Sequence, residues 1–166
     1  MLMVTGAILL NGGCARTAKK AAETHAEPSK ITVLVNASGP IVLTTSAAEF
    51  QILPSGYVQA LLLQAGQKLS LDEPRESRLG ESDYLVQEGK ELHFKPDFSQ
   101  AKVTDAVGKL GRGKRVEIPA QPLSPSGTGL RRTLQVEVYD DFPNLLLSSV
   151  AYTNAGTSEY HIDRII

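Results

Sequence analysis

Residues 133–139 read TLQVEVY, and this stretch decides the fold class. Its apolar residues alternate with polar ones, Leu134, Val136 and Val138 against Gln135 and Glu137. Successive side chains of a β-strand point to opposite faces of the sheet, so an alternation of period two places one kind of residue on each face. The stretch therefore predicts a strand with an apolar face on a core and a polar face toward water.

The same pattern extends along the chain from residue 31 onward. We expect further strands at residues 31–35, 41–45, about 49–53, 83–87, 91–94 and 144–154, with one more beginning at His161. Turn residues separate them, such as Pro54-Ser55-Gly56 and Glu88-Gly89-Lys90. Residues 57–71 fit either a helix or a strand–turn–strand, and Gly66 favours the second. Many short strands between turns predict an all-β protein, an antiparallel β-sandwich.

The stretch GKLGRGKR, residues 108–115, fits the first seven positions of the phosphate-binding pattern G-x-x-x-x-G-K-[ST]. Arg115 stands where the pattern needs a Ser or Thr to ligate magnesium, and no helix is expected to follow, because Pro119 and Pro122 interrupt the next residues. We therefore interpret the stretch as a hairpin. Strands at residues 101–110 and 114–118 would flank a turn at residues 111–113, with its basic side chains in water.

Composition excludes few classes of protein. The 17 basic and 18 acidic residues are nearly balanced, which argues against a nucleic-acid-binding protein. Aromatic residues make up 5% and tryptophan is absent, so the composition does not favour a sugar-binding module, although it does not exclude one. The single cysteine, Cys14, allows no disulfide within the chain and no cysteine metal site.

The first thirty residues are typical of an exported protein. Residues 1–10 form an apolar run of signal-peptide length, and Gly12 and Gly13 precede Cys14 as in the lipobox of bacterial lipoproteins. Asn11 departs from the aliphatic residue that the lipobox requires, and a mis-chosen start codon before an unstructured terminus is the alternative. We expect a signal segment at residues 1–14, a polar linker at 15–30 and the sandwich at 31–166. The protein would then be periplasmic, anchored to the outer membrane through a lipid on Cys14, or extracellular.

The sequence contains no recognisable catalytic constellation. The three histidines, His25, His93 and His161, lie far apart, and none has a second ligand at metal-binding spacing. The acidic pair Asp140-Asp141 precedes Phe142-Pro143 and fits ordinary turn chemistry better than catalysis, because adjacent strand residues point to opposite faces. We therefore expect no catalytic residue, no metal ligand and no cofactor site in this chain.

Two segments, LGRGKRVEI and GLRRTLQVEVYDDFPNLLLSSVAYTNAGTSEYHIDRI, carry a family resemblance. They resemble the N-terminal β-sandwich, or super-sandwich, of bacterial α-galactosidase-like glycoside hydrolases of the melibiase clan. The matching features are a Gly-Lys hairpin, a strand ending in Tyr-Asp-Asp-Phe-Pro, in which Phe142-Pro143 would pin a bend, and a strand ending in Tyr152-Thr153-Asn154. The resemblance covers roughly residues 110–166 and is faint before them.

The resemblance implies a domain that supports a (β/α)8 catalytic barrel in the same full-length chain. The two catalytic carboxylates of the family lie on that barrel, which needs about 200 residues or more, so no catalytic residue carries over to this chain. The resemblance also implies that the sandwich is incomplete at its C-terminus. The alternatives are a free-standing envelope lipoprotein whose sandwich binds a glycan or a protein, and a purely structural envelope protein. A carbohydrate ligand and a homo-oligomer stay open, whereas nucleic acid is not expected.

Overall fold

The structure, a computed structural model, describes residues 29–72, 83–123 and 129–166. These residues form antiparallel β-sheets and one short 3₁₀ helix, η2 (Phe98–Gln100), with no α-helix among them. The prediction of an all-β antiparallel sandwich is confirmed. The segment 57–71, which the sequence left open, is two strands joined at Ala65-Gly66.

The first sheet is a meander in which each strand pairs with the next along the chain. Its order is β1-β2-β3-β4-β5. The strands are β1 (Thr32–Leu34), β2 (Ile41–Thr44), β3 (Ala48–Ile52), β4 (Val58–Gln64) and β5 (Gln67–Ser70). Because the connections are short, this sheet is built almost entirely from neighbouring segments of sequence.

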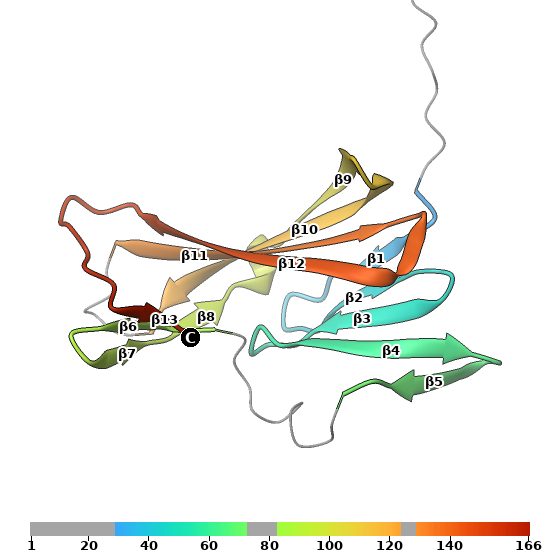
Figure 1. Ribbon diagram of the computed structural model, residues 1–166, viewed down its shortest axis with the longest axis horizontal. Coiled ribbons are helices and arrows are strands. Elements are labelled where there is room, and N and C mark those ends of the chain that lie inside the picture. The colour runs from blue at the N-terminus through green and yellow to red at the C-terminus, as the bar shows by residue number, and fades with distance from the viewer. Residues whose placement is uncertain (1–28, 73–82, 124–128) are drawn as a thin grey trace, which may run out of the picture.

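The second sheet contains the longest strands of the molecule and faces the first. Its order is β12-β11-β10-β8, and β9 also pairs with β10. The strands are β8 (Phe94–Pro96), β9 (Lys102–Gly108), β10 (Gly111–Pro122), β11 (Leu130–Tyr139) and β12 (Phe142–Asn154). Figure 1 shows β10, β11 and β12 crossing the molecule together, with β9 projecting at one end.

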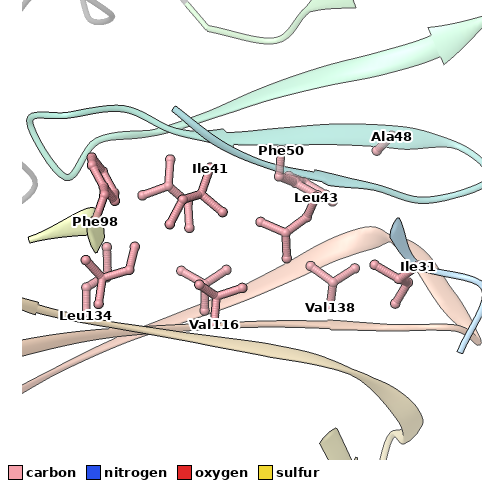
Figure 2. Packing of buried hydrophobic residues seen from close by; sticks show 12 residues of the cluster. Ile31, Ile41, Leu43, Ala48, Phe50, Phe98, Val116, Leu134 and Val138 are labelled. Atoms are coloured by element: carbon pink, nitrogen blue, oxygen red, sulfur yellow. The ribbon is translucent and has the colours of Figure 1, made fainter. Parts of the chain in front are cut away.

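The core lies between the two sheets. Leu134, Val136 and Val138 of β11 are almost completely buried, as the alternation in residues 133–139 predicts. They pack against residues of the first sheet, and Figure 2 shows the side chains meeting between the layers. The buried cluster consists of Ile31, Ile41, Leu43, Ala48, Phe50, Ile52, Phe98, Val116, Ile118, Leu134, Val136 and Val138. Two sheets that each bury one face in this way form a sandwich.

A small third sheet closes the other end of the molecule. Its order is β13-β6-β7, with β6 (Leu85–Gln87), β7 (Lys90–Leu92) and β13 (Arg164–Ile165). A second cluster of buried residues lies beside it, consisting of Leu85, Leu92, Phe94, Ala120 and Leu130. The hairpin predicted around Glu88-Gly89 is therefore confirmed, but Phe94 leaves it and pairs with β10 instead.

The basic hairpin differs from the prediction in two respects. Its turn is at Lys109-Leu110, and Gly111 and Gly113 already lie in β10. Lys114 and Arg115 are strand residues with carboxylate partners on the adjacent strands, Asp105 of β9 and Glu137 of β11. The prediction of a turn at residues 111–113 was wrong because Gly113 is needed for close approach to the backbone of β11, whereas Gly111 follows the turn with a φ of +92°.

β10 also continues through both prolines that were expected to interrupt it. The carbonyl of Pro119 accepts a hydrogen bond from the amide of Asp97 at 2.8 Å. Since a residue of an antiparallel strand turns its nitrogen and carbonyl to the same neighbour, the missing N–H of Pro119 faces this side. There β9 has ended, opposite Glu117, and β8 begins, opposite Ala120. The Pro119–Asp97 pair therefore keeps one ladder hydrogen bond and lacks only the reciprocal one, at the end of β8.

The bend expected at Phe142-Pro143 lies one step earlier in the chain. Asp140 and Asp141 form the two-residue turn between β11 and β12, and Phe142 already pairs with Tyr139. The register shifts between Val138 and Tyr139, which is typical of a β-bulge next to a tight turn.

Candidate functional site

The fold brings the basic stretch at residues 108–115 and the acidic pair Asp140-Asp141 to the same end of the second sheet. The β11–β12 turn lies beside the start of β10, and a β-carbon added at Gly111 would lie 2.9 Å from Oδ2 of Asp141. A depression of about 440 Å³ separates them, lined by Lys30, Val107, Gly108, Gly111, Arg112, Asp140 and Asp141. This proximity could not be read from the sequence, because it depends on the pairing of β10 with β11.

The polar groups at this depression hold two segments of the same chain together. Oδ1 of Asp140 accepts hydrogen bonds from the hydroxyl of Ser29 and the backbone amide of Lys30, both at 2.9 Å. Asp140 therefore holds the segment that enters β1. The lining residues mix both signs of charge and include no aromatic ring, which gives no platform on which a sugar could stack.

The described histidines each have a nearby carboxylate and no second metal ligand. Nε2 of His93 lies 3.0 Å from Glu91, and Nε2 of His161 lies 3.6 Å from Asp163. Among the residues that the structure describes, no group of three His, Cys, Asp or Glu side chains could hold a metal ion. His25 and Cys14, with the rest of the segments at 1–14 and 15–28, lie outside the described residues, so lipidation of Cys14 stays a prediction.

A buried polar cluster that the sequence did not indicate joins the small sheet to the second sheet. Nε of Arg132 donates to Oδ2 of Asp83 at 2.8 Å, and the hydroxyl of Tyr152 donates to the same carboxylate. Burial and the hydrogen bond to Asp83 raise the pKa of Tyr152. Arg132 of β11 and Tyr152 of β12 are cross-strand partners, and Asp83 reaches them from the approach to β6, far away in the sequence. Because each charge in this cluster has its partner, the cluster serves to hold the small sheet on the second sheet.

A second polar cluster lies on the outer face of the second sheet. Glu137 accepts a hydrogen bond from the hydroxyl of Tyr139 at 2.7 Å, and Nε of Arg115 donates to it at 2.6 Å. Tyr139 and Arg115 lower the pKa of Glu137, while burial opposes them. The residue spacing on β11, with Glu137 and Tyr139 two apart, is the one signal in the sequence that could have indicated this contact.

The remaining feature is an edge, formed by β12. β12 is the last strand of the second sheet, and no described strand pairs with its other side. Its side chains are mostly exposed, although Leu146 and Val150 pack on the core. All thirteen residues of β12 are uncharged, which is unusual because edge strands ordinarily carry charges that prevent pairing with another chain.

The first sheet extends beyond this edge. β12 contacts β3 across the sandwich, and β4 and β5 follow β3 on the outside. Leu62 of β4 and Leu69 of β5 face the second sheet, because Leu62 pairs with buried Ala48 and Leu69 pairs with Leu62. Leu69 is nevertheless 56% exposed and Leu71 is 61% exposed. Figure 1 shows β5 at the margin of the molecule, away from β12. We call the free side of β12 together with Leu62, Leu69 and Leu71 the open corner.

No protein-family model, curated protein or solved structure matches this chain. The resemblance over residues 110–166, a stretch that contains β10, β11, β12 and β13, therefore stays a prediction. No helix within the described residues has the length and apolar character to cross a membrane. The open corner is the surface on which a functional proposal can rest.

Proposed function

We propose that this chain is the non-catalytic N-terminal sandwich of an exported glycoside hydrolase of the α-galactosidase type. In this role it supports the catalytic barrel of the same full-length protein. The complete enzyme would cleave terminal α-linked galactose or a related sugar by the two-carboxylate retaining mechanism that the resemblance implies. An N-terminal signal with lipidation at Cys14 belongs to the same proposal.

The observation that carries the proposal is the open corner. An edge of thirteen uncharged residues beside exposed leucines is the kind of surface that a domain buries against another domain. The buried polar residues leave the open corner as the surface for a partner. Asp83, Arg132 and Tyr152 bind one another, and Asp140 binds Ser29 and Lys30, so these residues stabilise the fold.

Two measurements test the proposal. The first reads the coding sequence beyond the codon for Ile166, where alternating strands and helices with acidic residues at the strand ends are expected. The second measures hydrolysis of 4-nitrophenyl α-galactoside. The 166-residue chain should show no turnover, and the full-length protein should show it. Turnover by this chain, or a stop codon directly after Ile166, contradicts the proposal and leaves the envelope lipoprotein as the better account.

The docking surface has its own test in the full-length protein. Leu69→Lys places a charge on the open corner, and Leu34→Lys places one at a residue of β1 that is similarly exposed, at 65%, on the opposite edge of the same sheet. Leu69→Lys should lower the melting temperature of the full-length protein but not of this chain alone. Leu34→Lys should change neither.

A further inference from the structure

We infer that the open corner accepts a β-hairpin, whose first strand pairs antiparallel with β12 and whose second strand covers β5. The inference rests on the proposed function, because the hairpin would come from the part of the enzyme that this sandwich supports. It goes further by naming the form of the partner segment and the backbone that it binds.

The backbone of β12 supplies the first argument. An edge strand presents a row of N–H and C=O groups that water or another strand must satisfy. At one end the row is closed, since the hydroxyl of Thr45 donates to the carbonyl of Pro143 at 2.8 Å. From Asn144 to Tyr152 no described strand occupies this side of β12. That length is typical of a strand in a sheet.

The chemistry of the corner limits the occupant. β12 carries no charge, and the residues of β4 and β5 that face the second sheet are Val58, Ala60, Leu62, Gln64, Gln67 and Leu69. Lys68 lies on the other face, where both oxygens of Glu49 bind its ammonium group. A strand that fits here is therefore uncharged on its inner face, with apolar residues at alternate positions.

The overhang of the first sheet indicates two strands. Strands of both sheets are spaced about 4.8 Å apart, so each new strand beside β12 covers one further strand below. β12 contacts β3, so the first added strand lies over β4 and the second lies over β5. The side chains agree, because β4 is half-buried whereas all of β5 is exposed.

The same overhang excludes a second copy paired through β12. Such a copy would bring its own β3 beneath its own β12, at the place that β4 and β5 of the first copy already occupy. A helix is also a poor occupant. It could cover Leu69 and Leu71, but its backbone groups bond within the helix and leave the edge of β12 unpaired. A β-hairpin of a single layer avoids the clash with β4 and β5 and also pairs with the edge of β12.

The test uses the 166-residue chain and a short β-hairpin peptide with blocked ends, in which two strands of alternating valine and threonine are joined by an Asn-Gly turn. Hydrogen exchange of the β12 amides is measured by NMR with and without the peptide. In an antiparallel ladder the N–H groups of a strand point alternately to its two neighbours, so the peptide should slow exchange at every second residue of β12. The same peptide with a central proline should give no protection. Leu69→Lys and Leu71→Lys should lose the protection, and Leu34→Lys should keep it.

Several results would overturn the inference. One is that the peptide slows no amide exchange in β12 up to its solubility limit, or slows it without the alternation along the strand. Another is that Leu34→Lys loses the protection as much as Leu69→Lys does. A third is that the protein forms a dimer at high concentration through β12. This test and the tests of the proposed function can fail separately. Protection of β12 without a barrel encoded after Ile166 would contradict the proposed function and support the hairpin at the open corner. A barrel without protection of β12 would support the proposed function and contradict the hairpin.

Discussion

The guanidinium of Arg132 lies in the interior with only 3% of its side chain exposed, bound to the carboxylate of Asp83. The pair joins β11 to the segment that leads into β6, so it connects the second sheet to the small sheet. Burial disfavours both charges, and the ion pair persists because each charge neutralises the other while Tyr152 adds a hydrogen bond. The attachment of the small sheet depends on this contact and on the apolar cluster around Leu85 and Leu130.

Asp83→Ala is expected to be strongly destabilising. It leaves the buried guanidinium of Arg132 without a counter-charge, which typically costs about 3–5 kcal/mol. Urea unfolding of the variant measures the loss. Lys114→Met is the control, because Lys114 pairs with the carboxylate of Asp105, which is 74% exposed, and exposed pairs contribute about 0–1 kcal/mol.

A double variant separates the charge effect from packing. Asp83→Leu combined with Arg132→Met removes both charges and keeps apolar volume, so it should be more stable than Asp83→Ala alone. A double variant as unstable as the single one would mean that the contact acts through shape and not through charge.

Gly113→Ala is expected to disrupt the start of the second sheet. An added β-carbon would lie 1.9 Å from the carbonyl oxygen of Val138 and 2.8 Å from the Cα of Tyr139, both backbone atoms of the paired strand. Because the backbone cannot move aside without breaking the ladder, we expect a loss of about 3 kcal/mol or more, at the upper end of overpacking costs. Thermal unfolding measures it.

Gly108→Ala provides the control for this substitution on the adjacent strand. Its added β-carbon would meet only the hydroxyl of Tyr139, at 3.8 Å, which is an ordinary contact. The melting temperature of Gly108→Ala should therefore stay close to that of the parent chain. Equal effects at the two glycines would contradict the register of β10 and β11.

The sequence predicted the sheets well because the signal is local. Each strand of the first sheet pairs with its neighbour in the chain, so alternation and turn residues were sufficient. The errors arose where a residue type has more than one use. Gly113 was interpreted as a turn residue, but it allows close approach of two strands. Pro119 was interpreted as a break, but β10 continues through it, and its carbonyl accepts a hydrogen bond from the amide of Asp97.

The candidate sites were beyond prediction because they depend on distant segments. Arg132 and Tyr152 meet through the pairing of β11 with β12, and Asp83, which precedes β6, is 49 residues from Arg132 and 69 from Tyr152 in sequence. The open corner depends on which strands of the two sheets face each other. Nothing in the local pattern of β5 distinguishes an exposed Leu69 from a buried one.

Tyr152 should make the stability of the fold depend on alkaline pH. Burial, followed by the hydrogen bond to Asp83, raises its pKa above the ordinary value of 10.0. A raised pKa means that the contribution to stability is complete below pH 10.0 and is lost as the pH rises above it. Urea unfolding at pH values on both sides of 10.0 should show this decline.

Tyr152→Phe should remove most of that decline, although it also loses one hydrogen bond, which typically contributes about 1 kcal/mol at every pH. The pKa of Tyr139 is raised in the same direction by Glu137, so Tyr139→Phe should remove a smaller part. An unchanged alkaline decline in the double variant would show that neither tyrosine is responsible.

Glu49 should govern part of the stability at acid pH. Glu49 is 7% exposed, and hydrogen bonds from Lys68 lower its pKa below the ordinary value of 4.5, while burial opposes this effect. A lowered pKa gives a contribution to stability that is present above pH 4.5 and is lost as the pH falls through the folded-state pKa. Unfolding free energies measured above and below pH 4.5 should therefore decrease toward acid.

The contribution of Glu49 can be assigned through its partner. Lys68→Met removes the main cause of the low pKa and leaves the carboxylate in place, so the acid decline should become shallower. Glu49→Gln should have the same effect. If Lys68→Met kept the full acid decline, the ion pair between β3 and β5 would not be its source.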